Sequence, residues 1–158
     1  MLELLADWAT RGVLGYVAVA VAAATPWLEV LVVVPPAILL DLHPGWVGLT
    51  AFVGNYLPVV AIVAGWGALA DRWARRRGRA PATGAGRGER GRRILARYGL
   101  PGLALLGPLV TGIHLATVLA LGTGASRRAI LVWTGASLAV WTAGLVAATV
   151  AGVEAVVG

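Results

Sequence analysis

The chain has 158 residues and a net charge of +6; 59% of its residues are hydrophobic and only 13% are charged. Soluble domains carry about 25% charged residues, so the composition excludes an ordinary soluble protein and indicates an all-α integral membrane protein. The sequence has no cysteine, which excludes disulfide bonds and iron–sulfur chemistry.

Four apolar regions long enough to cross a bilayer follow one another in the chain: residues 12–40, 45–70, 99–122 and 129–153. A helix needs about 20 apolar residues to span the hydrocarbon core. The simplest interpretation is therefore four transmembrane helices in a single membrane domain comprising residues 1–158. We favour a second interpretation, three transmembrane helices plus two re-entrant helical hairpins, because the first and third regions contain helix breakers.

The first region is too long for one helix, and prolines interrupt it. We predict a first helix over residues 5–25, followed by a first repeat over residues 26–70 that consists of a re-entrant hairpin and a full transmembrane helix. Pro35 and Pro36 are expected to form the turn of this hairpin, because proline lacks the backbone donor that continues a helix. Irregular backbone at membrane depth is tolerated only where protein or a cavity surrounds it, so the hairpin predicts a site.

Glu29 is the only acidic residue deep inside an apolar run. A carboxyl group in an apolar environment favours its neutral form, and an ionisable residue inside a membrane is a functional candidate by default. We predict that Glu29 couples transport to protons. The alternative is that Glu29 lies near the external interface, close to Trp27, and caps the first half of the hairpin.

Asn55, the only asparagine, is expected on the helix that follows the first hairpin, beside Gly54 and ahead of Pro58. A buried amide at this position can bind substrate. It can equally form the hydrogen bonds between helices that polar side chains commonly make in membranes, and the sequence leaves both roles open.

Ten of the 13 arginines fall within residues 71–97, which we predict to be a flexible loop. Because arginine and lysine gather in cytoplasmic loops, we place this loop and the N-terminus on the cytoplasmic side of the cell membrane, with the arginines against anionic lipid head groups. Nucleic-acid binding is not expected, because no aromatic residue that could stack on a base lies between Trp73 and Tyr98.

Arg127 and Arg128 decide how the third apolar region is interpreted. Four simple helices would place these two residues in a short external turn, which contradicts the positive-inside bias. We therefore predict that residues 98–153 form a second repeat, with a re-entrant hairpin that enters and leaves on the cytoplasmic side and a last helix whose C-terminus is external. The tip of this hairpin is expected at Gly107, Pro108 and Gly112.

Thr111 and His114 lie about one turn apart near this tip and are candidate substrate-binding residues. His114 could relay protons or hold an anionic head group; the alternative for it is a hydrogen bond between helices. Broken helices also point backbone N–H groups into the membrane, and these groups attract anions, although carbonyl groups of the same loops could bind a cation. We expect an anionic or phosphate-bearing substrate and no metal ion or other cofactor.

The two repeats share a short sequence similarity. Laying residues 43–59 over residues 124–140 pairs Gly54 with Gly135, Leu57 with Leu138, Val59 with Val140 and Phe52 with Trp133. The charge bias gives the two copies opposite orientations, and inverted repeats with broken helices are typical of transporters. Three spans and two hairpins are few for enclosing a pathway, so we expect a homodimer.

Two stretches, residues 28–59 and 97–138, resemble the family named "putative small multidrug export protein", which looks like a compact relative of the DedA and VTT membrane proteins. The resemblance covers residues 24–150. The family pattern is an acid shortly before proline, a Gly-Asn pair, a basic loop, a Tyr-Gly start, a proline followed by Thr-Gly, and a glycine-rich last helix. Carried across residue by residue, the pattern falls on Glu29, Pro35, Gly54, Asn55, Tyr98, Gly99, Pro108, Thr111 and Gly112.

The resemblance implies lipid translocation, because DedA-like proteins are implicated in moving lipids, including undecaprenyl phosphate, across the bilayer with proton-motive force. DedA-like proteins carry an arginine in the second hairpin, and this chain has none between Arg97 and Arg127. A phosphate group would then have to bind to backbone amides, to Thr111 and His114, or to Arg97 at the mouth of the hairpin.

We therefore predict a proton-coupled transporter or flippase for an anionic lipid or amphiphile, such as a polyprenyl phosphate. The alternatives are an exporter of small cationic drugs, with Glu29 as the counter-charge, and a non-transporting membrane assembly protein. An enzyme is not expected, because the sequence contains no nucleophile-base-orienter set and no cluster of metal ligands.

Overall fold

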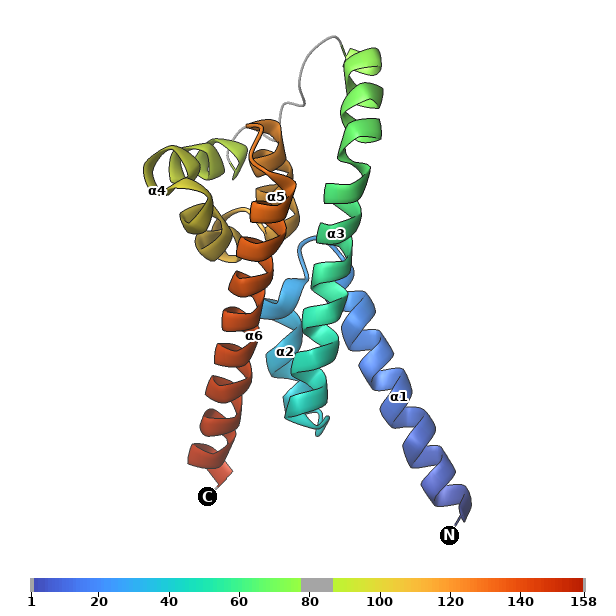
Figure 1. Cartoon of the computed structure of the whole chain (residues 1–158). Coiled ribbons are helices and arrows are strands. Elements are labelled where there is room, and N and C mark those ends of the chain that lie inside the picture. Colours follow the sequence, from blue (N-terminus) through green and yellow to red (C-terminus); the bar gives the residue numbers. More distant parts are fainter. Residues whose placement is uncertain (1, 78–86, 158) are drawn as a thin grey trace. The chain divides into compact units, whose positions relative to one another are not determined.

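The computed structural model describes residues 2–77 and 87–157, and every regular element in these ranges is a helix (Figure 1). The helices are α1 (Leu2–Ala24), α2 (Glu29–Leu39), α3 (Pro44–Arg77), α4 (Arg87–Val110), α5 (Ile113–Gly122) and α6 (Arg127–Val157). The prediction of an all-α protein is confirmed.

Two of the described helices are long and apolar enough to cross a membrane. The apolar stretch of α3 is Pro44–Ala68, and that of α6 is Arg127–Val156. At 1.5 Å per residue they are about 37 Å and about 45 Å long, more than the roughly 30 Å of the hydrocarbon core. These are the full helices predicted for the two repeats. Helices α1, α2 and α5 contain shorter apolar stretches.

Both long helices begin with residues suited to a helix start. Pro44 is the first residue of α3, where its missing amide hydrogen removes no intrahelical bond and its fixed φ is already helical. The side chain of Ser126 precedes α6 and accepts a hydrogen bond from the Ala129 amide at 3.2 Å, as an N-cap residue does. The two helix starts are therefore encoded locally in the sequence.

Between α1 and α2 the chain turns at residues 25–28. The Thr25 amide donates to the Ala22 carbonyl at 3.0 Å, and the Leu28 amide donates to the Thr25 carbonyl at 3.2 Å. Trp27 adopts the left-handed region with φ 87°, which is unfavourable for a residue other than glycine. The two helices pack against each other as a helical hairpin.

Helix α2 continues through Pro35 and Pro36 to Leu39, so the predicted reversal at these prolines is wrong. A proline inside a helix costs about 3 kcal/mol. The same helix buries five apolar side chains, Val30, Val33, Val34, Ala37 and Ile38, and burying a valine or isoleucine contributes about 1.5–3 kcal/mol. Packing of this face therefore offsets the two missing backbone donors.

The second reversal, between α4 and α5, lies where a glycine was predicted to permit it. Gly112 has φ 82°, and its amide and the Thr111 amide both donate to the Gly107 carbonyl, at 2.8 and 2.9 Å. Gly107 and Pro108 belong to the last turn of α4. A Cβ on Gly107 would lie 3.0 Å from the Cβ of Ala116, so this glycine lets α4 and α5 approach closely.

The alternative of four simple helices is wrong, because residues 12–40 and 99–122 are each divided into two helices by a turn.

The prediction of a loop over residues 71–97 is wrong at both ends, since α3 continues to Arg77 and α4 begins at Arg87. Arginine is a good helix former. The remainder of the predicted loop, residues 78–86, lies outside the described residues.

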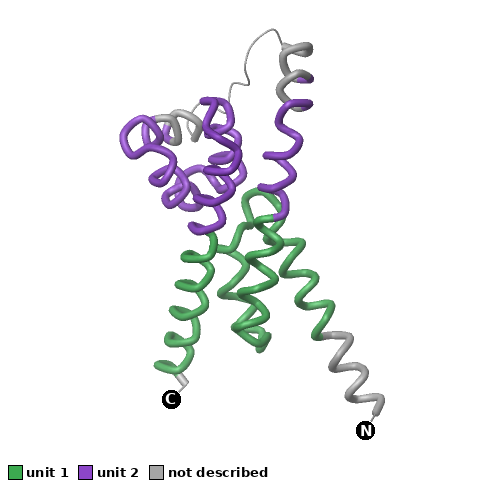
Figure 2. Tube along the Cα trace, in the orientation of Figure 1, with its two compact units in different colours: residues 1–56, 138–158 green, residues 57–137 purple. Residues whose placement is uncertain are grey.

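The chain divides into two compact units, and the division falls inside α3 and α6 (Figure 2). Unit 1 comprises residues 1–56 and 138–158, and unit 2 comprises residues 57–137. Each unit thus contains one helical hairpin, part of α3 and part of α6.

In unit 1, glycines bring the helices together. A Cβ on Gly54 of α3 would overlap the backbone of Ala20 in α1, and a Cβ on Gly48 would lie 3.2 Å from Val146 in α6. The Tyr16 hydroxyl accepts a hydrogen bond from the His43 amide at 3.1 Å, which ties α1 to the start of α3. Small residues at helix contacts are the usual packing device inside membranes.

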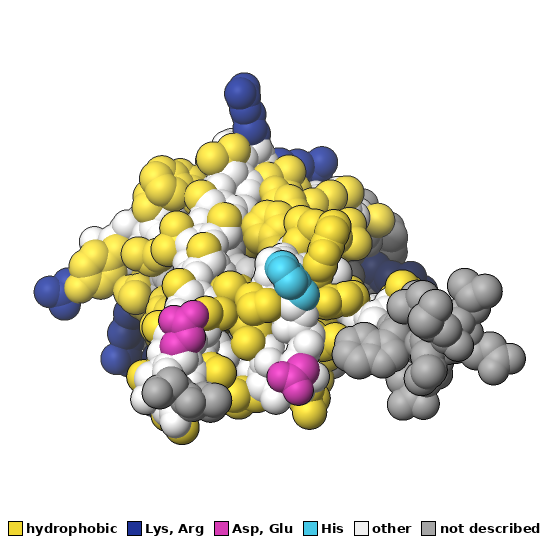
Figure 3. All heavy atoms as spheres, turned by 90° about the horizontal axis from the view of Figure 1, so that it is seen from below, with side chains coloured by type: hydrophobic (Ala, Val, Ile, Leu, Met, Phe, Trp, Pro, Cys, Tyr) yellow, Lys and Arg dark blue, Asp and Glu magenta, His cyan; other side chains and the backbone are white. Residues whose placement is uncertain are grey.

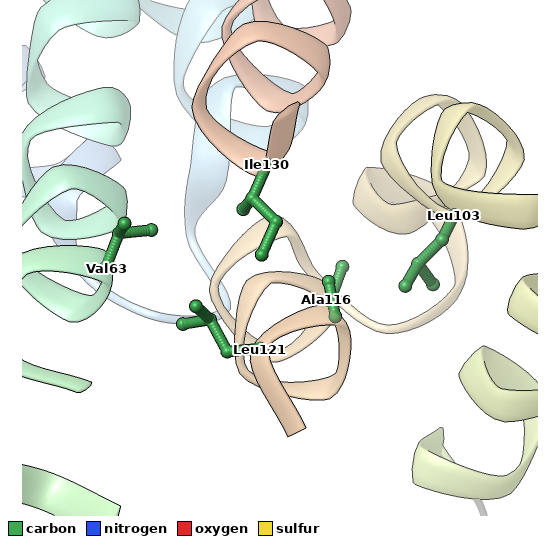
Figure 4. Close-up of a cluster of buried hydrophobic side chains, with 6 residues drawn as sticks. Val63, Leu103, Ala116, Leu121 and Ile130 are labelled. Carbon is green, nitrogen blue, oxygen red and sulfur yellow. The ribbon is translucent and has the colours of Figure 1, made fainter. Parts of the chain in front are cut away.

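Unit 2 has its own apolar core, centred on α5 (Figure 4). Ala116 and Leu121 of α5 lie among Val63 of α3, Leu103 of α4 and Ile130 of α6, all of them buried. The Ser137 hydroxyl donates to the Ala104 carbonyl at 2.7 Å and links α6 to α4. The second hairpin is therefore held between the segments of α3 and α6 that belong to its unit.

The surface is unusually apolar. Hydrophobic side chains cover most of the described surface in Figure 3, and charged side chains occur at only a few places in that view. The exposed residues of α1 include Val13, Leu14, Val17 and Val21, which lie on one side of the helix by their spacing. Such a surface fits hydrocarbon rather than water.

Candidate functional site

Glu29 is the first residue of α2 and is only 4% exposed, although the turn residues immediately before it are exposed. Its φ of 26° lies outside the usual helical range, which is a strained conformation for a residue with a side chain. A carboxylate in the first turn of a helix is stabilised by the helix dipole. The structure therefore holds this acid inside the protein, at the start of a helix.

Asn55 lies in the middle of the apolar stretch of α3 and is 0% exposed. Neither its amide nitrogen nor its carbonyl oxygen has a hydrogen-bond partner among the described residues. The predicted structural role, a hydrogen bond to a neighbouring helix, is therefore not what the described residues show. Asn55 and Glu29 both belong to unit 1.

Thr111 and His114 flank the turn between α4 and α5, and both are buried. The Thr111 hydroxyl donates to the carbonyls of Gly107 (3.4 Å) and Gly112 (3.2 Å), so its hydrogen-bonding capacity serves the turn. His114 is in the first turn of α5, which begins directly after Gly112. The structure thus brings Thr111, Gly112 and His114 together at one end of α5, in unit 2.

Arg97 lies on an amphipathic segment of α4. Arg90, Arg93 and Arg97 are exposed and lie on one face by their spacing of three and four residues. Ile94 and Leu95 pack against the core of unit 2. The guanidinium carbon of Arg97 is 5.4 Å from the centre of the Tyr98 ring, a cation–π geometry.

The helix is interrupted immediately after this segment. Gly99, with φ 66° and ψ −165°, separates the arginine-bearing part of α4 from its apolar part. A positive φ of this kind is readily adopted only by glycine. The break therefore separates a charged, exposed segment from an apolar segment within a few residues.

The sequence interpretation missed three buried polar residues in α6: Thr134, Ser137 and Thr142. Thr142 is 5% exposed and its hydroxyl has no hydrogen-bond partner among the described residues. For the last helix the sequence predicted only packing through glycines. The sequence does show three polar positions in an otherwise apolar run, but it does not indicate which of these hydroxyls lacks a partner.

Comparisons with known proteins give one finding. The family model described as "Putative small multi-drug export protein" matches residues 29–148, from the first residue of α2 into the last helix. No curated protein and no solved structure gives a significant match to the chain.

Proposed function

The chain belongs to the putative small multi-drug export protein family, and from this premise we propose that it is a proton-coupled membrane exporter whose coupling group is the carboxyl of Glu29. Its two long apolar helices support a membrane protein. The observation that carries the proposal is the burial of Glu29 at the start of α2.

Two opposing effects act on the Glu29 carboxyl. Burial of a charge is unfavourable unless partners compensate for it, whereas the helix N-terminus stabilises a carboxylate by about 0.3–1 kcal/mol, and by up to about 2 kcal/mol when it is partly buried. The other acids whose side chains are described, Asp41 and Glu154, are exposed, so Glu29 is the one buried acid among the described side chains.

The transported molecule in this proposal is an anionic lipid or amphiphile, such as a polyprenyl phosphate. The exposed arginine face of α4 supports this choice, because Arg90, Arg93 and Arg97 offer three positive charges beside the apolar part of the helix. Guanidinium groups bind phosphate oxygens well. His114 and the backbone amides at the start of α5 would receive the head group beyond them.

The architecture in this proposal is an inverted repeat with re-entrant hairpins. Each unit contains a helical hairpin, the first part of the long helix that follows this hairpin, and the last part of the other long helix. The two units therefore contain the same kinds of helical segment, and each segment of unit 1 has its counterpart in the other half of the chain in unit 2. Helices α2 (11 residues) and α5 (10 residues) are about 15–17 Å long, half of the hydrocarbon core, and broken helices of this kind carry the binding sites of many transporters.

A second candidate substrate is a small cationic drug. The observation that favours it is the same buried carboxyl, because a lipophilic cation could replace a proton at Glu29. The family description, which names multi-drug export, points in the same direction. The relation to DedA and VTT proteins, on which the lipid substrate partly depends, stays a prediction, as does the homodimer. A re-entrant hairpin of α1 and α2 would place the N-terminus on the side of the membrane where α3 begins, so the predicted cytoplasmic N-terminus requires α1 to cross the membrane instead.

The test is transport by purified protein in liposomes with an imposed proton gradient. Wild type and Glu29→Gln are compared with a labelled polyprenyl phosphate and with a lipophilic cation. Asp41→Asn is the matched control, because Asp41 is an exposed acid in the turn after α2 whose φ of 62° asparagine also tolerates.

We expect gradient-driven movement of the polyprenyl phosphate by wild type and Asp41→Asn, and none by Glu29→Gln. Movement of the cation alone would select the drug substrate. If neither substrate moves, or if Glu29→Gln equals wild type, the proton-coupled proposal fails and a non-transporting assembly role becomes the better account.

A further inference from the structure

The threonine hydroxyls of this protein follow one pattern, with one exception. Among the threonines whose side chains are described, all but one donate their hydroxyl to a backbone carbonyl of their own segment: Thr25, Thr50, Thr111, Thr117, Thr123, Thr134 and Thr149. Thr142 is the exception, since its buried hydroxyl makes no such bond. The carbonyl four residues earlier is the usual acceptor for a threonine hydroxyl in a helix. Because the Thr142 hydroxyl does not bond to it, this hydroxyl points toward a different group.

Asn55 presents the same anomaly in the same unit. It is 0% exposed, and both its amide nitrogen and its carbonyl oxygen lack partners among the described residues. A buried amide normally satisfies most of its hydrogen bonds, and a native structure contains few exceptions. Two exceptions, on α3 and on α6 within unit 1, point to a shared cause.

Both residues lie on the side of their helix that belongs to the contact between α3 and α6 in unit 1. A Cβ on Gly48 would lie 3.7 Å from the Thr142 methyl group, so Thr142 lies in the contact between α3 and α6. Asn55 follows Gly48 by two helical turns and lies on the same face of α3. Within unit 1 the two segments run antiparallel (Figures 1 and 2), so moving from Gly48 to Asn55 corresponds to moving from Thr142 toward Leu138, which is 0% exposed.

The unused groups define the chemistry of a ligand. Asn55 offers two N–H donors and one acceptor, and Thr142 offers one O–H donor, so donors predominate. A metal cation is a poor fit, because two side-chain oxygens are far fewer than the six to eight that Ca²⁺ takes. Oxygen atoms that accept hydrogen bonds fit this set.

We propose that Asn55 and Thr142 form a binding site for hydrogen-bond-accepting oxygen on the contact between α3 and α6 in unit 1. The oxygen comes either from bound water or from the phosphate head group of the transported molecule. The second source rests on the proposed function, whereas the first does not.

The test uses the full chain in detergent and two readouts that need no transport. In X-ray footprinting, hydroxyl radicals formed from bound water oxidise adjacent side chains, and mass spectrometry detects the product at Leu138. The second readout is the midpoint of thermal unfolding with and without glycerol 1-phosphate, which carries a phosphate head group without acyl chains. The variants are Thr142→Val and Asn55→Leu, with Thr149→Val as the matched control on the same helix, because the Thr149 hydroxyl already bonds to the Leu145 carbonyl.

We expect oxidation of buried Leu138 in wild type and Thr149→Val, and its loss in Thr142→Val and Asn55→Leu. If glycerol 1-phosphate protects Leu138 and raises the unfolding midpoint in wild type, the head group is the source of the oxygen. If Leu138 is oxidised and glycerol 1-phosphate changes neither readout, water is the source. If Leu138 is not oxidised in wild type and glycerol 1-phosphate does not shift the unfolding midpoint, the proposed site does not exist. This outcome does not depend on whether Glu29 couples transport to protons.

Discussion

Gly54 supplies a prediction whose magnitude follows from the geometry of one helix contact. A Cβ at this position would lie 2.7 Å from the Ala20 Cα and 2.8 Å from its carbonyl carbon, and real Cβ contacts are not this short. Because the obstacle is backbone, it cannot move aside as a side chain would, so α1 and α3 must separate. Overpacking of this kind costs about 1–3 kcal/mol, and we expect Gly54→Ala to fall at the upper end.

Gly65 on the same helix is the matched control. A Cβ there meets nothing within 4 Å, so Gly65→Ala should gain about 0.5–1 kcal/mol from the better helix propensity of alanine. Because the propensity gain applies at both positions, the two substitutions should differ by the overpacking cost, about 3 kcal/mol. For a chain of this size, 1 kcal/mol shifts the unfolding midpoint by about 2–4 °C, so the midpoints in detergent, followed by circular dichroism at 222 nm, should differ by roughly 10 °C. Equal midpoints for the two variants would refute the close contact between α1 and α3.

Three further predictions concern the second hairpin, the arginine face and the topology. Gly112→Ala should destabilise the protein by about 1–3 kcal/mol, because φ 82° and ψ 145° at Gly112 are strained for alanine; an unchanged unfolding midpoint would contradict the turn. Replacing Arg90 and Arg97 with glutamine should weaken binding of the detergent-solubilised protein to vesicles of phosphatidylglycerol but not of phosphatidylcholine, as measured by flotation, and equal binding to both would exclude an electrostatic contact. A reporter enzyme fused after Gly158 should be active only on the external side if the hairpins are re-entrant, whereas cytoplasmic activity would refute that topology.

The reversal at Gly112 could be predicted because glycine alone adopts its backbone conformation readily. The reversal between α1 and α2 carries no comparable signal. Its strained residues are Trp27 and Glu29, neither of which is typical of a turn, so their conformation depends on the packing of the hairpin. The turn was wrongly predicted at Pro35 and Pro36. These prolines show where backbone donors are missing, but they do not show whether packing of buried neighbours keeps the helix intact.

The candidate site was also only partly visible in the sequence. The burial of Glu29 was predictable, because Glu29 is a lone acid in an apolar run; its role in transport stays a prediction. Thr142 was not predictable, since most threonines in membrane helices bond to their own backbone and nothing in the sequence distinguishes the one that does not. The arginine segment was assigned to a loop on charge, although the spacing of Arg90, Arg93 and Arg97 around Ile94 and Leu95 already matched about two turns of an amphipathic helix.

The central claim is that Glu29 carries the coupled proton, and two modes of transport by one variant test it most directly. Proteoliposomes containing Glu29→Gln are assayed for exchange of labelled substrate between equal concentrations, which requires no proton movement, and for accumulation driven by a pH gradient. The account predicts that exchange persists while accumulation is lost, and that Asp41→Asn retains both. Accumulation by Glu29→Gln at the wild-type rate would contradict the account.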